Sequence, residues 1–207
     1  MVQERKNAVT FKGSPLTLIG PKLKAGDKAP DFKLVDTGLK SVTLADSRGK
    51  TRLVSIGPSI DTPVCDLQTK RFNQEASKCV APVIPSCRAH LNVPYGREDR
   101  ANISQETGTM HPKFPANAAV ISVSMDLLFA QAGWCGLSGA GKIQMLSDYQ
   151  EHVFGRAYGV LIKELRLLSR AVFVLGPDDK VQYVEYVKEV TGHPNYEKVL
   201  GFIKTRV

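Results

Sequence analysis

Hydrophobic positions in this chain gather in short runs separated by turn-forming residues, a pattern typical of β-strands. Strands are predicted at 8–11, 16–19, 32–35, 42–44, 53–57, 118–124, 142–146, 171–175 and 181–187. Helices are predicted at 64–77, 127–134, 153–158 and 196–204. The first two strands and the last two each flank a short turn, so each pair predicts a hairpin. Strands that alternate with helices and end in a hairpin indicate an α/β protein with a mixed central sheet flanked by helices.

The break after the strand at 53–57 opens the stretch with the clearest chemistry. A helix follows, which Asp61 or Thr62 can cap, and Pro63 suits its first turn because the missing N–H costs nothing there. Cys65 therefore falls among first-turn N–H groups that have no partner within the helix, where a thiolate is favoured over a thiol. A buried cysteine acting as a small apolar side chain is the alternative.

The spacing of Pro58, Thr62 and Cys65 resembles the active-site signature of the peroxiredoxins, in which three residues separate Pro from Thr and two separate Thr from Cys. The fuller string at 58–65, Pro-Ser-Ile-Asp-Thr-Pro-Val-Cys, is similar to that of the thiol peroxidases, the atypical two-cysteine peroxiredoxins. The resemblance implies a thioredoxin-like fold with an added N-terminal β-hairpin, and it favours Cys65 as a nucleophile. It also implies that Thr62 hydrogen-bonds to the sulfur or to a bound peroxide and that Pro58 screens the sulfur from water.

Further blocks of sequence follow the pattern of the same family, in the same order. They lie at 126–136, 146–149, 154–160 and 168–174. The first implies a resolving role for Cys135, which we expect at the end of the helix that begins at 127. The last implies that Arg170 is the cation beside the sulfur. Without the resemblance, Arg170 would be interpreted as a strand-end arginine in a surface ion pair.

The resemblance implies a thioredoxin-dependent peroxidase that works without a cofactor or a metal. Hydrogen peroxide or an alkyl hydroperoxide would oxidise Cys65 to a sulfenic acid and leave as water or an alcohol. Cys135 would then form an intramolecular disulfide with Cys65, and thioredoxin would reduce it. The family usually forms homodimers. Two alternatives use the same fold, namely a peroxide-responsive redox sensor and a module that binds a partner protein.

Composition narrows the other classes of function. A chain of 207 residues with 43% hydrophobic and 23% charged residues is that of one globular domain. The net charge of +8 is spread along the chain without a basic run, so no nucleic-acid partner is expected. No apolar run could span a membrane and no secretory signal precedes the first strand, so a cytoplasmic protein is expected. The four cysteines include no Cys-x-x-Cys pair, which argues against a thioredoxin-type reductase and a zinc ribbon.

The segment at about 79–118 does not fit the rest of the chain. It has no sustained periodicity and holds five prolines, Pro82, Pro85, Pro94, Pro112 and Pro115. We expect a single domain, 1–207, with this segment as an atypical insertion, since a structureless loop of this length is uncommon within a domain. A surface excursion, a functional lid and a stretch that does not belong to the protein all remain open. Its cysteines and histidines match no compact zinc site.

Overall fold

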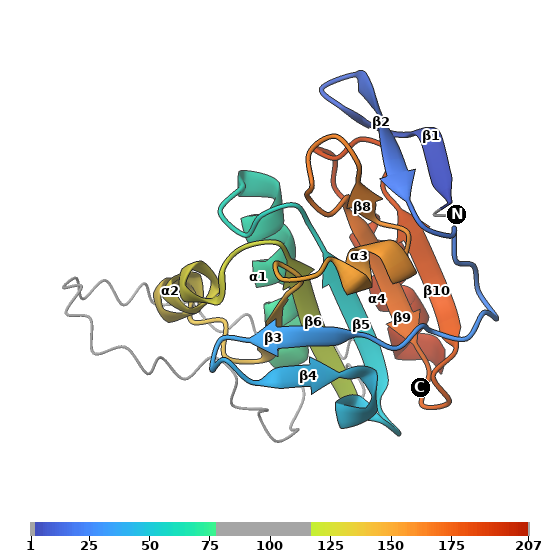
Figure 1. Ribbon diagram of the computed structural model, residues 1–207. Coiled ribbons are helices and arrows are strands. Elements are labelled where there is room, and N and C mark those ends of the chain that lie inside the picture. Colours follow the sequence, from blue (N-terminus) through green and yellow to red (C-terminus); the bar gives the residue numbers. More distant parts are fainter. Residues whose placement is uncertain (1–2, 78–116, 207) are drawn as a thin grey trace.

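The computed structural model describes residues 3–77 and 117–206 (Figure 1). Seven strands form the larger sheet, in the order β10-β9-β5-β6-β7-β3-β4, and a smaller sheet has the order β1-β2-β8. Helices cover the larger sheet, with α3 in front of it and α4 behind it in Figure 1. The predicted α/β architecture with a mixed sheet is confirmed.

β5 (Thr51–Ile56) lies in the middle of the larger sheet, and all six of its residues are buried. It runs parallel to β6 (Ala118–Ser124) and antiparallel to β9 (Ala171–Leu175). β7 (Ile143–Ser147) continues the parallel part beyond β6. A strand covered on both faces has no polar side, which explains why these segments show continuous apolar runs instead of alternation.

The outer strands of the larger sheet are antiparallel to their neighbours. β10 (Val181–Tyr186) forms the predicted hairpin with β9. At the other edge, β3 (Lys33–Asp36) pairs with both β7 and β4 (Ser41–Thr43), and a short 3₁₀ helix, η1 (Leu44–Ser47), follows β4. The predicted strands at both edges are therefore confirmed.

The N-terminal hairpin is also present as predicted. β1 (Glu4–Phe11) pairs with β2 (Ser14–Ile19) in antiparallel register. The sequence did not indicate β8 (Leu161–Ile162), which pairs with the free edge of β2 and completes the smaller sheet. A strand of two residues is too short to produce a periodic pattern.

Neighbouring residues of β5 serve different apolar clusters, because side chains alternate between the faces of a strand. Val54 packs with Phe154 and Tyr158 beneath α3 (Val153–Ala157). Leu53 belongs to the cluster on the other face, together with residues of the helices α1 (Pro63–Ser77), α2 (Leu128–Ser138) and α4 (Tyr196–Arg206). The larger sheet is thus the middle layer between two apolar cores.

Three of the four helices agree with the prediction, namely α1 (Pro63–Ser77), α3 and α4 (Tyr196–Arg206). The predicted end of the remaining helix at Cys135 and Gly136 is wrong, because α2 runs over Leu128–Ser138. Gly139 adopts the left-handed conformation (φ 64°) and its N–H donates to the Cys135 carbonyl at 3.1 Å, which ends the helix there. Cys135 therefore lies inside α2.

The predicted insertion, apart from its last two residues, lies outside the described residues. The same holds for two of the four cysteines, Cys79 and Cys87. Within the described residues, α1 ends at Ser77 and β6 begins at Ala118.

Candidate active site

Thr62 is the residue that caps α1. Its Oγ1 accepts the backbone N–H of Cys65 at 3.4 Å, and its carbonyl accepts the N–H of Asp66 at 2.9 Å as the first bond of the helix. Pro63 is the first residue of α1, one position before the predicted start and in the first turn as expected. The Thr62 hydroxyl donates to the Ser59 carbonyl at 3.0 Å, so in this state its one proton is used within the loop.

The Cys65 side chain is buried, with 4% of its surface exposed. Its Sγ accepts a hydrogen bond from Arg170 Nη2 at 3.3 Å. The other neighbour is the backbone at Gly57, where a Cβ atom would lie 2.6 Å from the sulfur. The sulfur therefore lies between the Arg170 guanidinium and the main chain at Gly57, where any side chain larger than hydrogen would overlap the sulfur.

Arg170 is 1% exposed and lies next to the first residue of β9. Besides the sulfur it donates from Nη1 to Gln68 Oε1 at 2.6 Å and from Nε to the Val190 carbonyl at 3.1 Å. No carboxylate forms an ion pair with it in the part of the chain that the structure describes. The alternative interpretation, a surface ion pair, is thus wrong.

Gln68 is a site residue that the sequence analysis did not identify. Its amide accepts from Arg170 and donates to Ser55 Oγ at 2.6 Å, so it connects the guanidinium to the end of β5. It lies three residues after Cys65, hence on the same face of α1. That spacing was the available signal, but a helical glutamine gives no indication of burial by itself.

Hydrogen bonds to a carboxylate just after β6 hold the loop between β5 and α1 in place. Asp126 accepts the Ile60 N–H and the Ser124 hydroxyl, both at 2.7 Å, through one carboxylate oxygen. Pro58 is buried in the same loop. A cavity of about 10 Å³ beside the sulfur is bordered by Gly57, among others. This is the room that one water molecule needs, so only the end of a substrate fits there without movement.

Cys135 lies in the helix next to α1 and is also 4% exposed. Both Cys65 and Cys135 are in the reduced form in this structure, with no disulfide between them. Cys135 belongs to the apolar cluster that includes Phe72 of α1. The indole N–H of Trp134 donates to Asp66 Oδ1 at 2.9 Å, which connects the residue before Cys135 to the residue after Cys65.

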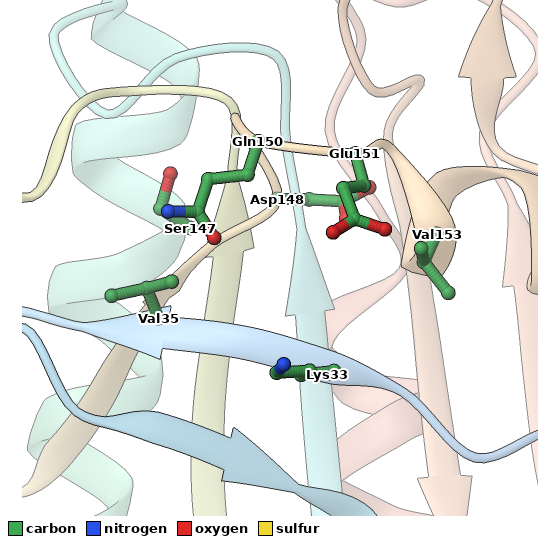
Figure 2. A pocket seen from close by; sticks show the side chains of 7 residues that line it. All are labelled: Lys33, Val35, Ser147, Asp148, Gln150, Glu151 and Val153. Carbon is green, nitrogen blue, oxygen red and sulfur yellow. The ribbon is translucent and has the colours of Figure 1, made fainter.

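A second hollow lies at the end of β7, away from the cysteines (Figure 2). Its volume is about 20 Å³. Asp148 borders it and accepts the backbone N–H groups of Phe154 at 3.1 Å and of Gly155 at 2.8 Å, at the start of α3. Burial raises the pKa of Asp148, and these two hydrogen bonds offset part of that rise. The carboxylate stabilises the helix end, and we assign no chemistry to this hollow.

Two further features are absent from the described ranges, 3–77 and 117–206. No three His, Cys, Asp or Glu side chains there lie close enough to hold a metal ion. No helix there is both long and apolar enough to cross a lipid bilayer.

Comparison with known proteins identifies the family. The redoxin family profile matches residues 24–88 and 113–200. The thiol peroxidase of Bacillus subtilis (strain 168) is 44% identical over 199 residues, which cover 96% of this chain and 98% of that protein. The thiol peroxidase of Halalkalibacterium halodurans is 45% identical over 197 residues, which cover 95% of this chain and 97% of that protein. The chain belongs to the redoxin family, among the thiol peroxidases.

Solved structures agree with this assignment. The peroxiredoxin-like protein from Aquifex aeolicus has 31% sequence identity and a TM-score of 0.72, and the match covers 96% of each chain. The thiol peroxidase from Chromobacterium violaceum shares the fold at 18% identity, with a TM-score of 0.70 over 95% of this chain and 94% of that one. The predicted thioredoxin-like fold and the predicted family are confirmed. The protein is a peroxiredoxin-type peroxidase, an oxidoreductase that reduces peroxides with a thiol.

The structure brings three of the five predicted site residues together. Thr62 caps α1, Cys65 lies in its first turn, and Arg170 reaches the sulfur from the position before β9. Pro58 lies in the preceding loop. Cys135 is on another helix, which the Asp66–Trp134 hydrogen bond links to α1.

Proposed function

We propose that Cys65 is the peroxidatic residue of a thioredoxin-dependent peroxidase that reduces hydrogen peroxide and alkyl hydroperoxides. The observation that carries the proposal is the hydrogen bond of 3.3 Å from Arg170 Nη2 to Cys65 Sγ. A guanidinium stays positively charged throughout the working pH range, and beside a sulfur it favours the thiolate, which is the nucleophilic form.

In the proposed reaction the thiolate attacks the terminal oxygen of the hydroperoxide. A sulfur–oxygen bond forms and the oxygen–oxygen bond breaks, so the sulfur is oxidised to a sulfenic acid. The leaving oxygen takes a proton and departs as water or an alcohol. Negative charge develops on that oxygen, and donors aimed at it accelerate the step, typically by about 10² to 10³ for one donor.

Arg170 is suited to supply such a donor because it is buried and held from two other sides. The Gln68 amide and the Val190 carbonyl fix its plane, so it needs little reorganisation during the reaction. Its burial also keeps bulk water from screening the charge. Thr62 contributes by holding the Cys65 N–H, and it acts on the peroxide itself once its hydroxyl leaves the Ser59 carbonyl.

Cys135 completes the proposed cycle as the resolving residue. Its thiol attacks the sulfenic sulfur of Cys65, the sulfur–oxygen bond breaks, and water leaves with the thiol proton. Thioredoxin then reduces the disulfide by thiol–disulfide exchange. The names of the relatives and the family pattern around Cys135 support this part. The proposal includes assembly as a homodimer because the family usually forms one.

The test is redox mass spectrometry of the purified protein after one equivalent of hydrogen peroxide. We expect a Cys65–Cys135 disulfide in the wild type and a trapped Cys65 sulfenic acid in Cys135→Ser. Cys65→Ser should consume no peroxide while its circular dichroism spectrum stays native. Cys79→Ser is the matched control and should react as the wild type does. Peroxide consumption by Cys65→Ser near the wild-type rate would overturn the assignment.

A further inference from the structure

One hydrogen bond connects the immediate neighbours of the two cysteines. Trp134 Nε1 donates to Asp66 Oδ1 at 2.9 Å. Asp66 follows Cys65 in α1, and Trp134 precedes Cys135 in α2. A movement of either cysteine toward the other therefore displaces one partner of this bond relative to the other.

The two thiols have different surroundings in the reduced structure. Cys65 Sγ is bonded to Arg170 and packed against Gly57. Cys135 belongs to the apolar cluster of α1, α2 and α4. A disulfide requires an S–S distance of about 2 Å and Cα atoms within about 7 Å of each other. At least one cysteine must leave its present surroundings before the bond forms, and both are in regular helix.

The Asp66–Trp134 bond is built to resist that movement. Its acceptor is a carboxylate, which makes a stronger hydrogen bond than a neutral oxygen does. Lys70 forms an exposed ion pair with the same carboxylate, with Nζ at 2.9 Å from Oδ1 and 3.0 Å from Oδ2, and a pair of this kind contributes little. Trp134 is only 9% exposed, so its N–H loses a partner that water cannot readily replace while the ring stays packed.

We propose that the Asp66–Trp134 hydrogen bond sets the rate at which Cys135 resolves the Cys65 sulfenic acid. Asp66 and Trp134 are positioning residues in this scheme, which rests on the roles proposed above for the two cysteines. The bond holds α1 and α2 in the reduced arrangement and has to break before the thiol of Cys135 reaches the sulfenic sulfur. It thereby lengthens the life of the sulfenic acid.

A longer-lived sulfenic acid has a chemical consequence. A second hydroperoxide can oxidise it to a sulfinic acid, in which the sulfur gains one more oxygen and the peroxide again leaves as water or an alcohol. Resolution competes with that reaction. Weakening the hydrogen bond should therefore speed disulfide formation and protect Cys65 from overoxidation.

Two variants remove the bond from opposite sides. Trp134→Phe removes the N–H and keeps an aromatic ring and the Asp66 charge. Asp66→Ala removes the acceptor and keeps the indole. A change shared by both variants reports the bond, because only the second alters the charge beside Cys65. Asp66→Asn keeps an acceptor oxygen as the conservative rescue, and Lys70→Ala is the control that breaks the ion pair alone.

Formation of the Cys65 sulfenic acid and formation of the disulfide are measured separately. Samples are mixed with hydrogen peroxide, quenched with acid at set times, alkylated and analysed by mass spectrometry. We expect both variants to form the Cys65–Cys135 disulfide about threefold to tenfold faster than the wild type, the effect of one hydrogen bond of ordinary net strength, because the Asp66 carboxylate is partly exposed to water. Trp134→Phe should form the sulfenic acid at the wild-type rate. The sulfinic fraction in excess peroxide should fall by a similar factor, and the rescue and control variants should stay within about twofold of the wild type.

The chain has one tryptophan, so the wild type provides a readout that needs no variant. Trp134 emission should change with the disulfide step and not with the sulfenic step. Unchanged emission, or resolution rates in both variants equal to or below the wild-type rate, would overturn the proposal. If the wild type forms no Cys65–Cys135 disulfide at all, the cysteine roles fail first. If the wild type forms this disulfide but both variants resolve at the wild-type rate, the cysteine roles stand and the hydrogen bond does not control the step.

Discussion

Gly57 leaves room for the Cys65 sulfur at the end of β5. A Cβ atom there would lie 2.6 Å from Sγ and 3.6 Å from Arg170 Nη1. We expect Gly57→Ala to displace the sulfur and lower the rate of peroxide reduction at least about tenfold, while overpacking costs about 1 to 3 kcal/mol of unfolding free energy. Stopped-flow peroxide consumption and urea unfolding measure the two effects. Gly201→Ala, in α4 with open space around it, is the control and should keep the wild-type rate.

Thr62 serves both the helix and the proposed chemistry. Thr62→Val keeps the shape but removes the oxygen that accepts the Cys65 N–H. Loss of a cap should cost about 0.5 to 2 kcal/mol of unfolding free energy, and loss of the hydroxyl should lower the peroxide rate by about 10². Thr62→Ser retains the oxygen and should stay close to the wild type in urea unfolding and in peroxide consumption. Equal rates for Thr62→Val and Thr62→Ser would show that the hydroxyl takes no part in the reaction.

Gln68 orients Arg170 from one side. Gln68→Leu leaves the Nη1 group of a buried guanidinium without this acceptor, so we expect a loss of about 1 to 3 kcal/mol in unfolding free energy. The peroxide rate should also fall, because the donor at the sulfur is no longer fixed. Ser55→Ala removes only the support of the Gln68 amide and should have a smaller effect on both quantities. A wild-type rate in Gln68→Leu would contradict the orienting role.

The site residues differ in how far the sequence determines them. Thr62 and Pro63 follow from capping rules, which depend on a few neighbouring positions. The family resemblance, not the local pattern, indicated Arg170. Gln68 remained unidentified because its function comes from a partner 102 positions away in the chain. Local rules describe such a residue only as part of a helix.

At the scale of elements, the end of α2 could not be predicted from the sequence because several glycines could each have ended the helix. Three glycines follow one another closely, at 133, 136 and 139. Gly139 alone among them has a positive φ, and it ends the helix. Glycine permits a left-handed residue but does not require one, so the sequence offered three possible ends.

The N-terminal hairpin is tied to the loop after β10 through one carboxylate. Glu189 accepts the Thr10 hydroxyl at 2.8 Å and the backbone N–H groups of Lys12 at 3.0 Å and Gly13 at 3.2 Å. The hydrogen bonds from Thr10, from Thr191 and from the Gly13 N–H lower the pKa of Glu189 to about 2 from an ordinary value of 4.5. The charged form is thus the one that stabilises the hairpin.

This sets the sign of a pH effect. The stabilisation is complete above about pH 4.5, where the unfolded chain is ionised as well, and is lost as the pH falls toward about 2. Glu189→Gln should melt below the wild type at pH 7, and the difference in Tm should shrink between about pH 4.5 and pH 2. Thermal unfolding followed by circular dichroism measures it, with the exposed carboxylate variant Glu151→Gln as control. A difference that does not change with pH would contradict this account.

For the whole molecule, the pattern of apolar runs was sufficient to predict the fold class and most strands, but not the order of the sheet. Both hairpins follow from adjacent runs with short turns. The pairing of β5 with β9 joins distant segments, and no local pattern encodes which strand becomes the neighbour of which. The family resemblance implied the thioredoxin-like fold, but no strand order was predicted from it.

We propose that the segment at 79–118 is an insertion in a single domain and is dispensable for chemistry. The redoxin profile supports this, since it matches on both sides and leaves 89–112 unmatched. Replacing 80–117 by a short Gly-Ser linker should preserve thioredoxin-coupled turnover, because loop length costs only about 0.6 kcal/mol per doubling. Lost turnover with a native-like circular dichroism spectrum would instead indicate a lid or a partner site.

The antiparallel pairing of β5 with β9 also has a consequence during synthesis. Val54 pairs with Phe173, so at typical translation rates the central strand waits roughly 6 to 24 s for a neighbour about 120 positions later. Until then an apolar strand that is buried on both faces in the finished protein has one open edge on the ribosome. Every residue encoded between these two strands lengthens that wait, and with it the time in which the nascent chain depends on chaperones to avoid aggregation.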